Sequence, residues 1–154
     1  MKITKIAAAS ALILCVILAT ASAGCTGNTT QNIEGNVSVI ADSKLTDPMN
    51  DIVKAFGKMY TKINTTITYG ESSDIASQMI SKTISPDNFV STDETSINAV
   101  EKANLSAKYV AETLPYNVMI DTAGESVTGK LFLAFMKGAD GKAIFKSYGY
   151  ATTA

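Results

Sequence analysis

The sequence predicts an α/β fold, in which strands alternate with helices around one central sheet. Residues 37–40 form a short β-rich run, and apolar residues then recur at helical spacing between residues 49 and 56. Residues 63–69 alternate apolar with polar side chains and lead into a second amphipathic stretch. Two such strand–helix units indicate a sheet of about four strands, with helices on both of its faces.

The N-terminal residues 1–24 have the features of an export signal. Lys2 and Lys5 precede an uncharged apolar stretch, and small residues lead to Cys25. A cysteine at this place indicates a lipobox, whose cleavage would leave Cys25 with a lipid anchor, although Ser22 replaces the leucine of a strong lipobox. The alternative is an uncleaved membrane anchor, because the apolar stretch nearly reaches spanning length. Both readings place the remainder at the extracellular or periplasmic face of the cell membrane.

Residues 25–35 are polar and are expected to form a tether, which leaves residues 36–154 as one domain. An exported chain would also expose its Asn-X-Ser/Thr sequons to glycosylation in a host that carries it out. These sequons begin at Asn28, Asn36, Asn64 and Asn104.

The composition narrows the classes of function. The sequence contains no His, no Arg and no Trp. Without His it lacks the usual catalytic base and the commonest metal ligand, and without Arg it lacks bidentate clamps for phosphate. The formal net charge is −1, and no basic patch indicates a nucleic-acid partner. We therefore expect a binding protein rather than an enzyme, with no cofactor and no metal.

Two serines follow the first two predicted strands. Ser43 lies in the loop before a helix whose start is marked by Thr46 and Pro48. Ser72 or Ser73 would cap the next helix. If the two strands are neighbours, hydroxyls and helix N–H groups meet at one sheet edge, which suits an oxyanion that needs no proton transfer. The alternative is a pair of ordinary turns, whose serines cap their own helices.

The second half of the chain supplies the remaining elements. The patterns predict strand 88–91, a helix capped within residues 92–95, strand 115–121, helix 127–137 and helix 142–147. Residues 106–114 show no clear period. In the last helix, Ile144, Phe145 and Tyr148 are expected to face the core.

One motif points to a different function. Residues 124–130 match the P-loop pattern and lie between a predicted strand and a predicted helix. The next residue is Leu131, whereas a P-loop has Ser or Thr there to bind magnesium. An exported chain also meets little ATP, so we do not expect nucleotide binding.

Four blocks of sequence are informative when taken together. They are Ile40-Ala-Asp-Ser-Lys-Leu45, Tyr69-Gly-Glu-Ser-Ser-Asp74, Pro86-Asp-Asn-Phe-Val-Ser-Thr-Asp93 and Ala143-Ile-Phe-Lys-Ser-Tyr-Gly-Tyr150. In this order they resemble the molybdate/tungstate-binding proteins of ABC importers, which have the type II periplasmic-binding-protein fold. The resemblance implies a mostly parallel sheet, a molybdate or tungstate ligand and an ABC permease as partner. By position, the oxyanion-binding serines of the family would be Ser43 and Ser72.

The chain differs from that family in length. Family members have two lobes, and the second is inserted between the segments that here end near Leu105 and start near Pro115. About ten residues fill this gap in the present chain. The resemblance therefore implies a single lobe over residues 36–154, without the remaining ligand contacts of the family, which include a tyrosine.

The chain also differs in the charge beside its serines. Asp42, Glu71 and Asp74 stand where the family has small or polar residues. Carboxylates there would repel a dianion, and Lys44 would offset one of them. These substitutions favour an alternative function, a surface or scaffold protein that is derived from such a lobe and no longer binds the anion.

Overall fold

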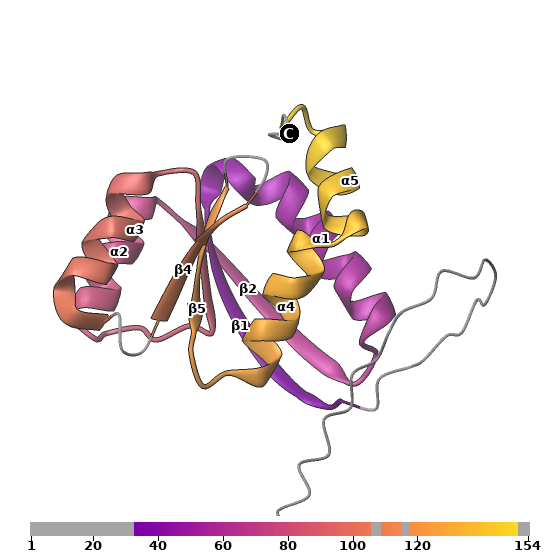
Figure 1. Ribbon diagram of the computed structural model, residues 1–154, viewed down its shortest axis with the longest axis horizontal. Helices are drawn as coiled ribbons and strands as arrows, with labels where there is room; N and C mark the ends of the chain where they lie inside the picture. Colours follow the sequence, from indigo (N-terminus) through magenta and orange to yellow (C-terminus); the bar gives the residue numbers. More distant parts are fainter. Residues whose placement is uncertain (1–32, 106–108, 115–117, 151–154) are drawn as a thin grey trace, which may run out of the picture.

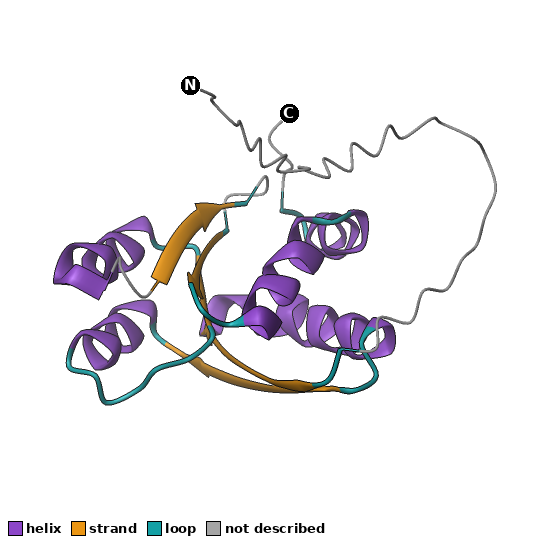
Figure 2. Cartoon of the chain, turned by 60° about the horizontal axis from the view of Figure 1, so that its bottom comes forward, coloured by secondary structure: helices purple, strands orange, loops and turns teal. Residues whose placement is uncertain are grey.

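The computed structural model describes residues 33–105, 109–114 and 118–150. A five-stranded sheet lies between two layers of helices (Figures 1 and 2). The elements are β1 (Gly35–Asp42), a 3-10 turn (Ser43–Leu45), α1 (Thr46–Met59), β2 (Ile63–Gly70), α2 (Ser72–Ile80), β3 (Asn88–Ser91), α3 (Glu94–Val100), a π-helical turn (Glu101–Leu105), β4 (Tyr109–Thr113), β5 (Met119–Ala123), α4 (Val127–Lys137) and α5 (Ala139–Ser147). The α/β prediction is confirmed.

The sheet has the strand order β2-β1-β3-β5-β4. Strand β1 pairs in parallel with β2 and β3, whereas β5 pairs antiparallel with β3 and β4. The sheet is therefore mixed, with its parallel part confined to the first three strands. The strand count exceeds the prediction by one because β4 lies in the stretch without a clear period. Strand β5 begins at Met119 rather than at 115, and residues 115–117 lie outside the described part.

Helices α1, α4 and α5 cover one face of the sheet, and α2 and α3 cover the other (Figure 1). The larger core lies under α1 and α4, where Phe56 packs edge-on against Phe132 and Phe135 with ring centroids 5.2 and 5.6 Å apart. Side chains alternate along β1. Val39 therefore enters this core, whereas Ile40 and the side chain of Asp42 point toward α2.

Two helix starts differ from the prediction. The 3-10 turn comes before α1, so Pro48 is the third residue of that helix and not the first. At α2, Glu71 holds the N-cap position and no side chain caps the helix. Ser72 is the first residue of α2 and is buried, so the capping role expected for Ser72 or Ser73 is wrong.

The last helix is longer than predicted, and its aromatic residues are placed differently. Phe145 is fully buried, as expected, but Tyr148 is 43% exposed. Helix α5 ends at Ser147, so Tyr148 turns outward and its hydroxyl donates to Asp51 Oδ2 at 2.7 Å. Tyr150 packs against Phe145 instead, edge-on, with ring centroids 5.4 Å apart.

Candidate functional site

The topology brings both serine-bearing turns to one edge of the sheet. Strands β1 and β2 are parallel neighbours, and Asp42 is aligned with Gly70 at their carboxyl ends. Ser43 directly follows the first of these residues, and α2 begins two residues after the second. The neighbouring strands that the oxyanion hypothesis requires are therefore present. Because β3 also runs parallel to β1, its last residue, Ser91, reaches the same edge.

Ser43 lies on the surface of this edge, in the 3-10 turn. The side chain of Asp42 caps the turn, since its Oδ1 accepts the backbone N–H of Lys44 at 2.8 Å. The backbone carbonyl of Ser43 accepts the hydroxyl of Thr46 at 2.6 Å. These bonds hold the turn in place and keep Ser43 exposed beside Lys44.

Ser72 lies beneath the surface and is only 4% exposed. Its hydroxyl donates to Asp42 Oδ2 and lies 2.6 Å from Ser91 Oγ. Ser91 Oγ in turn accepts the backbone N–H of Asp93 at 2.8 Å. The two predicted serines thus have different surroundings, because Ser43 faces solvent and Ser72 belongs to a buried polar network.

The ionisable groups in and around this network differ in their exposure and in their pKa values. Asp42 is 1% exposed, whereas Glu71 and Asp74 are exposed. A hydrogen bond from the hydroxyl of Ser96 holds the pKa of Asp93 below its usual range. Burial raises the pKa of Tyr150, and the negative charge of Asp42 raises it further.

Sequence reasoning missed Ser91 and Tyr150 as residues of this edge. Ser91 is the last residue of β3, as Asp42 and Gly70 are the last residues of β1 and β2. The polar residue at the end of a predicted buried strand was the signal that could have identified it. Tyr150 comes from beyond α5, and its place depends on tertiary packing alone.

The edge can supply several hydrogen-bond donors. In α2, the carbonyl of Glu71 accepts the N–H groups of Asp74 and Ile75 at 3.1 and 3.0 Å. The N–H groups of Ser72 and Ser73 come earlier, where a helix has no acceptor of its own. Among the described residues, no group of three or more His, Cys, Asp or Glu side chains could hold a metal ion. The arrangement suits binding by hydrogen bonds and helix N–H groups.

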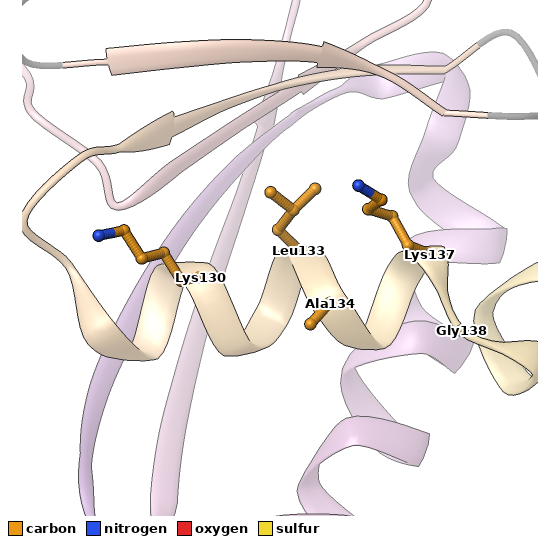
Figure 3. A pocket seen from close by; sticks show the side chains of 5 residues that line it. All are labelled: Lys130, Leu133, Ala134, Lys137 and Gly138. Carbon is orange, nitrogen blue, oxygen red and sulfur yellow. The ribbon is translucent and has the colours of Figure 1, made fainter. Parts of the chain in front are cut away.

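A pocket of about 330 Å³ lies away from this edge, along one face of α4 (Figure 3). Lys130 and Lys137 stand on the same side of the helix as Leu133. Lys137 already forms an ion pair with Glu112 at 2.5 Å. The P-loop pattern forms no phosphate loop here, because α4 begins at Val127 and Ser126 Oγ accepts the Gly129 N–H at 2.9 Å as an N-cap.

Hydrogen-bond donors gather at the carboxyl edge of the parallel strands, where α/β sheets commonly take their ligands. The chain belongs to the family described as "Bacterial extracellular solute-binding protein", which matches residues 37–120. No curated protein matches. One similar solved structure is the "substrate binding domain of putative molybdenum ABC transporter from Clostridium difficile", with a TM-score of 0.65 and 11% identity.

The extent of that structural match bears on the number of lobes. It covers 77% of this chain and 99% of that chain. The solved domain therefore has almost nothing beyond the single lobe that this chain matches, which confirms the one-lobe architecture. At this identity the likeness shows the fold alone. Among the described residues, no helix is long and apolar enough to cross a membrane.

Proposed function

We propose that the chain is the solute-binding component of a molybdate/tungstate-type ABC importer. It would bind a tetrahedral oxyanion through the hydroxyls of Ser43 and Ser72 and through backbone N–H groups, without any chemical reaction. The observation that carries this proposal is the parallel pairing of β1 and β2, whose carboxyl ends align at Asp42 and Gly70. The likeness to the substrate binding domain of a putative molybdenum ABC transporter supports molybdenum as the transported element and an ABC permease as partner.

A single open lobe should bind an oxyanion weakly. A ligand held between two lobes loses contact with water, which strengthens every polar contact to it. A ligand on one open edge stays solvated, and Glu71 and Asp74 oppose it from exposed positions. We therefore expect dissociation constants near the millimolar range, which corresponds to a binding free energy of only about 4 kcal/mol.

Titration calorimetry with molybdate, tungstate and sulfate tests this proposal. Ser43→Ala should abolish binding because it removes a donor, and Glu71→Ser should strengthen binding because it removes a repelling charge. Ser77→Ala is the matched control, since Ser77 lies one turn further along α2 and its hydroxyl donates to the Ser73 carbonyl at 2.8 Å. It should leave the affinity unchanged.

The alternative function is a surface or scaffold protein that kept the lobe and lost the ligand. The specific observation in its favour is that the Ser72 hydroxyl donates to Asp42, a residue of the same chain. If neither the parent protein nor the Glu71→Ser variant binds any of the three anions at millimolar concentration, the scaffold function replaces transport.

The proposed location is the outer face of the cell membrane, with a lipid on Cys25 as anchor after removal of residues 1–24. Both stretches lie outside the described residues. Two of the sequons, at Asn36 and Asn64, are exposed and aligned on β1 and β2, so both could accept a glycan. The intact mass of the membrane-extracted protein tests the anchor, and a mass that still includes residues 1–24 would support an uncleaved anchor instead.

A further inference from the structure

Asp42 differs from the other acidic residues at the carboxyl edge in what it contacts. It ends strand β1, which lies between β2 and β3 in the sheet, and is 1% exposed. Its Oδ1 accepts the Lys44 N–H at 2.8 Å, and its Oδ2 accepts the Ser72 hydroxyl. One donor belongs to the turn after β1 and the other to the start of α2. These are the two turns from which the proposed oxyanion site is built.

The direction of each hydrogen follows from the chemistry of the groups. An ionised carboxylate only accepts hydrogen bonds, so Ser72 must donate its single hydroxyl hydrogen to Asp42. Ser91 then donates to Ser72 across 2.6 Å, while its own oxygen accepts the Asp93 N–H at 2.8 Å. Each group in this chain of hydrogen bonds donates to the next: the Asp93 N–H to Ser91, Ser91 to Ser72, and Ser72 to Asp42. An oxyanion that approaches the Ser72 hydroxyl therefore meets an oxygen lone pair, because the hydroxyl hydrogen is already donated to Asp42.

We propose that the Asp42 carboxylate is a tethered competitor that occupies the anion position of this half-site, so that a free oxyanion binds only by displacing it. This inference rests on the function proposed above, and it makes Asp42 the residue that limits the affinity of the site for the oxyanion. Asp42 also lies beside the first turn of α2, where a negative charge is favourable. The exposed Glu71 acts differently, because its side chain makes no capping bond and its charge is screened by salt.

A matched pair of amide variants separates occupation from simple repulsion. Asp42→Asn and Glu71→Gln each remove one negative charge and keep the shape of the side chain, but only the first weakens a bond to Ser72. At 0.5 M salt, we expect Asp42→Asn to bind molybdate more tightly than the parent protein and Glu71→Gln to bind it equally. Asp42→Ala should free both donors and raise the affinity at least tenfold. The full-length protein in mild detergent is used throughout, and a thermal unfolding transition shows that each variant is folded.

A second measurement does not depend on the transported ligand. Asp42→Ala leaves a space with two unsatisfied donors, which a small free carboxylate can fill. Formate should therefore raise the thermal midpoint of Asp42→Ala, and it should not raise that of the parent protein or of Asp42→Asn.

The outcomes distinguish the two proposals. If formate stabilises Asp42→Ala but no protein binds molybdate, the inference about Asp42 stands and the transport function fails. If the parent protein and Asp42→Ala bind molybdate equally well, the function stands and the competitor role is overturned. Equal effects of Asp42→Asn and Glu71→Gln that disappear in high salt, or an absence of stabilisation by formate, would also overturn it.

Discussion

The carboxyl group of Asp121 is fully buried, and neither of its oxygens has a hydrogen-bond partner among the described residues. Its partners across the strands, Phe89 and Ala111, belong to the smaller core under α2 and α3. Burial, with a smaller contribution from the negative charge of Glu101, raises the pKa of Asp121 from 3.8 to about 7. A carboxyl group in such a place is held in its neutral form at acidic pH.

Asp121 should make the domain less stable as the pH rises. Between its unfolded pKa of 3.8 and its folded pKa of about 7, the folded state holds a proton that the unfolded chain has released. The free energy of unfolding should fall over this range by about 1.4 kcal/mol per pH unit. Urea unfolding at several pH values between 4.5 and 8 measures the slope. Asp121→Asn should flatten it, and equal slopes for the parent and this variant would contradict the assignment.

The site residues show what a sequence can and cannot predict at this scale. Ser43 and Ser72 could be placed at one edge because each follows a strand and precedes a helix, which is local information. That Asp42 binds Ser72 depends on β1 and β2 being neighbours and on α2 packing against the face to which Asp42 points. The charge of Asp42 suggested repulsion of a ligand, whereas its geometry shows a hydrogen bond within the chain.

At the scale of elements, two glycines make a matched test of helix packing. Gly141 lies in α5 where it crosses the end of α4, and a Cβ built there would lie 2.3 Å from the Met136 carbonyl oxygen. Gly57 lies in α1, and nothing is within 4 Å of its Cβ position. Gly141→Ala should destabilise the domain by about 1–3 kcal/mol through overpacking. Gly57→Ala should stabilise it by about 0.5–1 kcal/mol because alanine favours helix.

Thermal and urea unfolding of the two variants measure these opposite effects. Both substitutions add one methyl group to a helix, so the difference between them reports the contact between α5 and α4. A stabilising effect of Gly141→Ala would mean that α5 does not approach Met136 this closely.

The elements that were predicted well are those with local signals. Helix α4 has the predicted bounds, because Ser126 caps it and its apolar residues recur at helical spacing. Strand β4 was missed because it is a short edge strand that pairs only with β5, so its partner and not its own pattern defines it. Tyr148 was expected inside because it continues the apolar face, but the helix ends one residue before it.

For the whole molecule, β4 occupies the short stretch between Leu105 and Pro115, in which the family that the sequence resembles has its second lobe. Thr113 of β4 is paired with Met119 of β5, so β4 joins the same sheet and the chain returns into β5 within a few residues. The sequence predicts the single lobe from the resemblance, because only about ten residues fill the gap in which that family has its second lobe. It does not predict that the two strands form an antiparallel pair at the sheet edge, because that pairing depends on β5 lying beside β3.

The C-terminal part of the chain should be necessary for the whole fold. Helix α5 places Phe145 in the larger core, and Tyr150 packs edge-on against it. Each large side chain of this kind contributes roughly 1.5–3 kcal/mol when buried, against a total stability of about 5–15 kcal/mol. Deletion of residues 139–154 also exposes the surface of α1 and α4 that α5 covers, so the truncated domain should be unfolded.

Circular dichroism and thermal unfolding measure the effect of the deletion. A chain that ends at Tyr150 is the control, because it keeps every described contact of α5 and should unfold like the parent protein. Phe145→Ala is a graded version of the same test and should cost about 3–5 kcal/mol. If the protein without residues 139–154 unfolds at the same temperature as the parent protein, the role of α5 is refuted. A core that has lost Phe145 and its neighbours cannot keep the same stability.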